Sequence, residues 1–225
     1  MARNVTTSSS TATAKIRPFV APIRRRGGGG SDSTFDGDQR ERLFISSAML
    51  AVLMVIGTEM MLFSGLIGSF LVFRMQAPFW PPPGLPRLPI AVTWVNTFVL
   101  LGSAGTISMA LRAVHQSRQR ILRRYLLATL ALGVTFLAVQ GSEWVRLVAH
   151  GLKLSSGSYG SFFYILIGCH AAHVTAGVIW LSIVVVAAMR GRYNARNSSG
   201  IELCAVYWFF VCAVWPVLFG LVYLM

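Results

Sequence analysis

Five long runs of uncharged residues limit what this chain of 225 residues can fold into. The runs lie at residues 43–73, 88–111, 125–142, 154–189 and 203–225. Glu59 alone interrupts the first of them. A helix needs about 20 mostly apolar residues to cross the ~30 Å hydrocarbon core of a bilayer. The pattern predicts an all-α polytopic membrane protein, a bundle of five transmembrane helices at about 43–73, 89–111, 122–147, 159–189 and 201–224.

The basic residues between these runs predict the orientation of the bundle. Net charge is +13, and 16 of the 20 Lys and Arg residues fall in the N-terminal tail and in the second and fourth connections. With five crossings, these segments share one side of the membrane. Since connections on the cytoplasmic side are enriched in Lys and Arg, we expect a cytoplasmic N-terminus and a periplasmic C-terminus. The same rule explains the charge without invoking nucleic acid.

Two regions differ in composition, and we treat them as the domains of the chain. Residues 1–41 form a basic, low-complexity tail with a Ser/Thr tract and the segment RRRGGGG, expected to be disordered alone. A contact of this tail with anionic lipid or a partner subunit is the alternative. Residues 42–225 form the membrane domain. Its proline-rich connector FWPPPGLPRLP places Trp80 as an anchor at the outer interface.

Glu59 is the most unusual residue in the membrane domain. It lies in MVIGTEMMLFSG, and no cation is within a helical turn of it. A low-dielectric environment favours the protonated carboxyl group, so we expect a neutral Glu59 or a partner on another helix. Both structural hydrogen bonding and proton handling remain open. The small residues Gly57, Ser64 and Gly68 form a stripe that favours close helix packing, and Glu59 is offset from this stripe.

Other polar residues within the membrane are further candidates for contacts, because each costs free energy unless it is satisfied. His170 and His173 share a helix face, which is compatible with a redox-metal role or with hydrogen bonding to a neighbouring helix or a lipid headgroup. No ligand set accompanies the pair, which favours the second interpretation. Glu143 has Arg146 one turn away as an ion-pair partner. The remaining structural candidates are Asn96 and Glu202.

Six segments in order resemble subunit III of the haem-copper cytochrome c oxidase family, in its short five-helix bacterial form. The segments are GTEMMLFSG, FWPPPGLPRLP, VNTFVLLGS, QGSEW, YGSFFYILIGCHAAHVTAGVIWL and ELCAVYWFFVCAVW. The resemblance covers residues 42–225. It makes Glu59 the family's intramembrane glutamate, known for its reaction with carbodiimide. It also matches Glu143, His170, His173 and Glu202 to polar positions of the family.

The resemblance implies an accessory role in a bacterial inner membrane. Such a subunit packs against subunits I and II of a proton-translocating oxidase, binds phospholipid and supports proton uptake. It carries no redox centre or metal of its own, and the haem and copper belong to partner subunits. Larger respiratory supercomplexes are further partners. Phe209 and Cys212 replace a histidine and an aspartate of the family, which weakens any proton-related role for the last helix.

Three alternative functions stay open at this point. The chain resembles the equivalent subunit of a quinol oxidase or a nitric oxide reductase nearly as well. A small membrane transporter would need a polar pathway across the bundle. One carboxyl group and a histidine pair are few polar groups for such a pathway. The sequence also shows no inverted repeat of the kind that many transporters contain.

Overall fold

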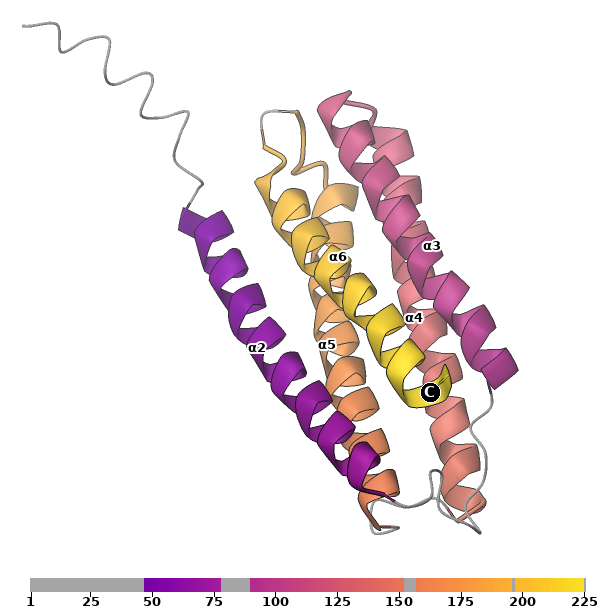
Figure 1. Cartoon of the computed structure of the whole chain (residues 1–225). Coiled ribbons are helices and arrows are strands. Elements are labelled where there is room, and N and C mark those ends of the chain that lie inside the picture. The colour runs from indigo at the N-terminus through magenta and orange to yellow at the C-terminus, as the bar shows by residue number, and fades with distance from the viewer. Residues whose placement is uncertain (1–46, 78–89, 152–156, 196, 225) are drawn as a thin grey trace, which may run out of the picture. The chain divides into compact units, whose positions relative to one another are not determined.

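The computed structural model describes residues 47–77, 90–151, 157–195 and 197–224. Five α-helices and one short π-helix account for nearly all of these residues (Figure 1). They are α2 (Ser47–Gln76), α3 (Ile90–His115), α4 (Gln119–Ala149), α5 (Gly157–Met189), α6 (Ser199–Phe219) and the π-helix η1 (Gly220–Leu224). The tail 1–41 and Trp80, the expected anchor at the outer interface, lie outside the described residues.

All five helices are long and apolar enough to cross a membrane, which confirms the predicted all-α fold. The predicted helix bounds agree with the observed ones to within about one turn at every described end. α3 ends four residues later than predicted, α2 ends three residues later, and α4 starts three residues earlier. α3 and α4 both extend beyond their uncharged runs to the short turn around Ser117. The φ angle of Ser117 is 54°, in the left-handed region.

Four helices form the packed core of the bundle. α3 lies against α4 and α6, and α5 lies against α4 and α6, so that each helix has two neighbours in the core (Figure 1). Short connections join α3 to α4 and α5 to α6 at the same end of the bundle. Consecutive helices are therefore antiparallel, as the short connections in the sequence predict.

Trp208 is the central side chain of this core. It is fully buried on α6. A Cβ atom added at Gly133 on α4 would come within 2.7 Å of the Trp208 ring, and one at Gly177 on α5 within 3.0 Å. The indole ring therefore fits between two helices only because both positions lack a side chain. This is the small-residue packing that lets membrane helices approach closely.

Hydrogen bonds from two tryptophans hold α6 against α3. Trp208 Nε1 donates to Ser103 Oγ at 3.0 Å, and Trp215 Nε1 donates to Thr97 Oγ1 at 2.9 Å. The hydroxyl of Thr97 in turn donates to the Thr93 carbonyl in its own helix, at 2.7 Å. Every polar group in these contacts is satisfied within the bundle, as a low-dielectric environment requires.

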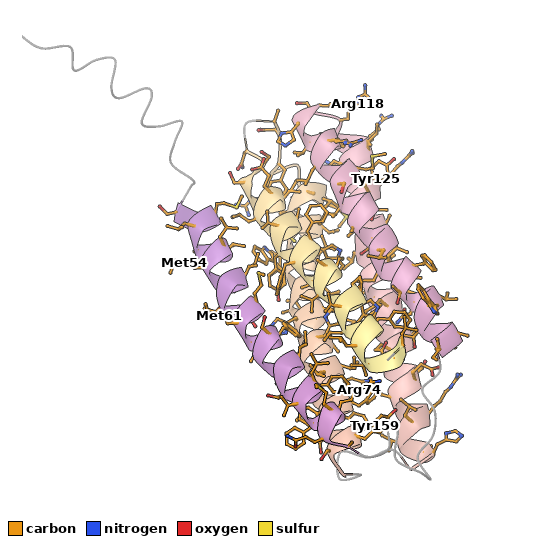
Figure 2. The ribbon with its side chains drawn as sticks, in the orientation of Figure 1. Met54, Met61, Arg74, Arg118, Tyr125 and Tyr159 are labelled. Atoms are coloured by element: carbon orange, nitrogen blue, oxygen red, sulfur yellow. The ribbon has the colours of Figure 1, made fainter. Side chains whose placement is uncertain are left out.

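α2 is the peripheral helix of the fold. It contacts α5 and α6, and only Phe63 and Phe70 of its residues are buried. Met54 and Met61 point away from the other helices (Figure 2), and they are 66% and 78% exposed. Near its C-terminal end, Arg74 Nη1 donates to the Leu221 carbonyl of η1 at 3.4 Å. α2 therefore presents most of its apolar surface to its surroundings.

Candidate intramembrane site

The central polar contact of the site joins α2 to α5. Glu59 Oε2 and His173 Nε2 are 2.7 Å apart. Their side chains are 25% and 15% exposed, so the pair sits in a largely enclosed position between the two helices. Glu59 therefore has its partner on another helix, which is one of the two possibilities that the sequence left open.

A backbone contact determines which nitrogen of His173 faces Glu59. His173 Nδ1 lies 2.7 Å from the carbonyl oxygen of Cys169, one turn earlier on α5. A carbonyl oxygen only accepts hydrogen bonds, so Nδ1 carries a hydrogen and donates it. The short contact between Nε2 and Oε2 then needs one further proton between the two atoms. With that proton on either atom, the pair has no net charge, which suits a membrane interior.

Aromatic side chains enclose the pair. The Phe63 ring lies 5.2 Å from the His173 ring, centroid to centroid. Tyr207 of α6 donates its hydroxyl hydrogen to the His173 carbonyl oxygen at 3.3 Å. Phe63 comes from α2 itself, so the residue that packs α2 on the core also contacts the imidazole partner of Glu59. The site is thus built from α2, α5 and α6 together.

His170 lies on the same helix but in a different environment. It is 1% exposed, and its ring stacks on Trp215 at 5.0 Å and meets Phe136 edge-on at 6.1 Å. Neither of its ring nitrogens has a hydrogen-bond partner among the described residues. His173 therefore bonds to a neighbouring helix, whereas His170 has no such bond among the described residues. Aromatic packing positions the His170 ring instead.

Glu143 lies near the end of α4, where the expected ion pair is present. Arg146 Nη1 is 3.0 Å from Glu143 Oε1, and the Glu143 side chain is 7% exposed against 68% for Arg146. One turn earlier, Gln140 Nε2 donates to the Tyr223 hydroxyl of η1 at 3.3 Å. The Gln140–Tyr223 bond ties the end of α4 to η1, whereas the ion pair lies within α4.

Asn96 and Glu202, the two other polar candidates in the described residues, each contact a neighbouring residue or helix. Asn96 on α3 is 2% exposed, and its Nδ2 donates to the Phe136 carbonyl of α4 at 3.2 Å. Glu202 opens α6, and Ser198 Oγ donates to its Oε1 at 2.6 Å. His115 Nε2 lies 3.6 Å from the same carboxyl oxygen, which links the ends of α3 and α6.

Sequence reasoning did not identify His173 as the partner of Glu59, nor the contribution of Tyr207. Both contacts depend on how three helices pack, and nothing in the local pattern shows that. The stripe of small residues on α2 was expected to favour close packing of another helix. A Cβ added at Gly57 or Gly68 would meet nothing within 4 Å, so none of the described helices packs closely there.

The donor atoms of the site are engaged in contacts within the protein. No group of three or more His, Cys, Asp or Glu side chains that could hold a metal ion occurs in the described part of the chain. Both nitrogens of His173 already face protein oxygen atoms, and aromatic rings pack around His170. The geometry of the Glu59–His173 contact fits a shared proton, and that of His170 fits helix packing.

A family profile and individual relatives of this chain all point to the same protein family. The profile of the family "Cytochrome c oxidase subunit III" matches residues 30–225. Cytochrome c oxidase subunit 3 of Synechocystis sp. is 34% identical over 178 residues, which cover 79% of this chain and 75% of the relative. The probable cytochrome c oxidase subunit 3 of Nocardia farcinica is 35% identical over 170 residues, covering 75% and 83%.

Proposed function

The chain belongs to the cytochrome c oxidase subunit III family, and we propose that it is a non-catalytic subunit of a bacterial aa3-type oxidase. In this role it packs against subunit I, with subunit II as the other core partner, during oxygen reduction in aerobic respiration. The family assignment makes it part of an oxidoreductase complex. The haem and copper that carry electrons belong to the partner subunits in this proposal.

The observation that carries the proposal is the pairing of Glu59 with His173. A carboxyl group and an imidazole that share one proton can hold or exchange that proton without creating net charge in the membrane. The carboxyl group of the pair belongs to α2, the helix with the most exposed apolar surface among the described helices, and the imidazole belongs to α5. This placement supports a role in proton uptake beside the redox core and in the stability of the complex.

The distribution of arginines supports insertion into the bacterial inner membrane with the N-terminus in the cytoplasm. Most arginines of the described residues lie at the end of the bundle that carries the α3–α4 and α5–α6 connections. They are Arg112, Arg118, Arg120, Arg123, Arg124, Arg190 and Arg192. The opposite end has Arg74 and Arg146. By the positive-inside rule, the arginine-rich end is cytoplasmic.

The exposed face of α2 supports contacts with partner subunits and phospholipid. Leu50, Met54, Met61 and Met75 on this helix are between 51% and 85% exposed. An apolar groove between α2 and α6, of about 350 Å³, continues this surface and is lined by residues such as Ile67 and Val214. Membrane lipid and apolar helices of a partner are both compatible with such a surface.

Affinity purification through a tag on this chain, in a mild detergent, tests the proposal. We expect subunits I and II to co-purify, identified by mass spectrometry, together with the visible absorption of haem a. A matched purification from cells that express the untagged chain is the control. Recovery of the chain without oxidase subunits would contradict the proposal, and a b-type haem spectrum would point to a quinol oxidase or nitric oxide reductase.

A further inference from the structure

The two ring nitrogens of His173 have different partners. Nε2 lies 2.7 Å from Glu59 Oε2 on α2, and Nδ1 lies 2.7 Å from the carbonyl oxygen of Cys169, one turn earlier on α5. The thiol of the same cysteine is also close, with its Sγ 3.8 Å from Nδ1. Cys169 therefore meets the imidazole with both its backbone carbonyl and its side chain, at the nitrogen that does not contact Glu59.

The surroundings of the imidazole contain few other polar atoms. The His173 side chain is 15% exposed, and the Phe63 ring lies 5.2 Å from the imidazole, centroid to centroid. Among the described residues, the hydrogen-bond partners of the ring are Glu59 and Cys169. Residues four apart on a helix are neighbours on its surface, so α5 itself holds the thiol beside Nδ1.

The contacts at Nδ1 affect where the proton between Glu59 and His173 lies. The proton can be on the carboxyl group, beside a neutral imidazole, or on the imidazole, beside a carboxylate. Hydrogen bonds from a charged donor are stronger than those from a neutral donor, so an acceptor at Nδ1 stabilises the second arrangement more than the first. Sulfur is a weak acceptor, but a hydrogen bond counts for more in a low-dielectric interior than in water.

We propose that Cys169 is a positioning residue for the shared proton of the Glu59–His173 pair. Its thiol supplements the carbonyl acceptor at Nδ1 and favours the arrangement in which the proton is on His173. This inference rests on the proposed function, in which the pair holds or exchanges a proton. It identifies a side chain that sets how readily Glu59 takes that proton up.

Infrared spectroscopy of the full chain, purified with the subunits that accompany it, tests this role, because a protonated carboxyl group and a carboxylate absorb differently. The contribution of Glu59 is the difference between each protein and the same protein with Glu59→Gln added. Cys169→Ala and Cys169→Val remove the sulfur acceptor, so both should show more protonated Glu59 than the wild type. Cys169→Ser keeps an acceptor atom at this position and should stay near the wild type.

Cys204→Ala is the matched control for these variants. Cys204 is also a free cysteine, it is 1% exposed on α6, and no hydrogen bond joins it to His173 among the described residues. Its replacement should leave the Glu59 band unchanged. An equal rise of the band in Cys204→Ala would show that the effect is not local and would overturn the proposal.

The melting temperature separates positioning from packing. A thiol that only fills space would lower the melting temperature when it is removed and leave the Glu59 band as it is. An unchanged band in both Cys169→Ala and Cys169→Val, with or without a loss of stability, would therefore overturn the proposal.

A measurement on the wild-type protein covers the case in which the Cys169 variants fail to fold. In solid-state NMR with isotope-labelled histidine and cysteine, we expect a hydrogen on His173 Nδ1 and a through-space contact between that hydrogen and the Cys169 side chain. The signals of His173 are identified by their loss in His173→Gln. A bare Nδ1, or a missing contact with Cys169, would contradict the inference.

These results are distinguishable from a failure of the proposed function. If subunits I and II do not co-purify with the chain, the oxidase assignment is wrong, and the Glu59 band still decides the role of Cys169. If they do co-purify and the band does not respond to Cys169→Ala or Cys169→Val, only the role of Cys169 is wrong.

Discussion

Glu59 on α2 and His173 on α5 bring a carboxyl oxygen and a ring nitrogen to 2.7 Å, although 114 residues separate them in the sequence. The contact joins the peripheral helix to the four-helix core. The Cys169 carbonyl orients the imidazole so that Nε2 faces α2. A residue that looks like an isolated acid in lipid is therefore one half of a pair that shares a proton.

The first prediction concerns the hydrogen bond of this pair. A glutamine at position 59 can donate its amide hydrogen to His173 Nε2, so Glu59→Gln should assemble normally and lose little stability. Glu59→Leu leaves Nε2 unpaired and should cost about 1–3 kcal/mol of the free energy of unfolding. The yield of the complex and its melting temperature provide the measurement.

The exposed neighbour Met61 supplies the control for these variants. Met61→Leu changes a side chain that is 78% exposed and should match wild type in both measurements. If Glu59→Gln lowered the yield and the melting temperature as much as Glu59→Leu, the carboxyl group itself would be required. The account of a neutral, proton-sharing pair with a replaceable hydrogen bond would then be wrong.

The second prediction concerns the contact between Gly133 and Trp208. An alanine at position 133 would place its Cβ 2.7 Å from the Trp208 ring, closer than side chains pack. Gly133→Ala should therefore destabilise the bundle by about 1–3 kcal/mol, in the range of overpacked cores. Gly141→Ala is the matched control on the same helix, since a Cβ there meets nothing within 4 Å. Equal melting temperatures for the two variants would refute the close fit.

The third prediction concerns the hydrogen bond between α6 and α3. Ser103→Ala removes the acceptor of Trp208 Nε1 and leaves a buried donor unpaired, at an expected cost of about 1–3 kcal/mol. Ser142→Ala removes a hydroxyl that, among the described residues, bonds the Val139 carbonyl of its own helix, and should cost less than about 0.5 kcal/mol. Thermal unfolding in the same detergent compares the two. A Ser103→Ala variant as stable as the control would show that the indole finds another acceptor.

The fourth prediction concerns the attachment of α2. Phe63 is 3% exposed and packs against His173 and Phe210, so Phe63→Ala leaves a cavity under α2. We expect a loss of about 2–4 kcal/mol and faster hydrogen exchange of the α2 backbone, with little change in α3. Met61→Ala, on the outer side of α2, is the control. Uniform loss of protection across all helices would mean that α2 is part of the cooperative core.

Much of the fold was predictable because membrane helices have a strong sequence signal. The length of an uncharged run predicts a helix that crosses the membrane. A short connection predicts that the two helices it joins are antiparallel. The end of α3 and the start of α4 were less predictable. Arg112 and Arg118 flank a turn beyond the hydrophobic core, where helix continues without a requirement for apolar residues.

The site was predictable in its residues but not in its pairing. Glu59 and His173 stand out as polar groups in apolar runs, yet only the packing of α2 on α5 brings them together. His170 shows the opposite case, since its position on the helix suggested a hydrogen bond to a neighbouring helix and the structure surrounds it with rings. Which side chains meet between two helices depends on how each helix is rotated about its own axis. The uncharged runs in the sequence do not specify that rotation.

The measurement that tests the central claim most directly follows the visible absorption when this chain is removed from the purified complex. Stronger detergent should release the subunit, and size-exclusion chromatography can then separate it from the remaining core. The account predicts that all haem absorption stays with the core and that the released chain has none above background. Haem or copper absorption that travels with the released chain would contradict the assignment of an accessory, non-catalytic subunit.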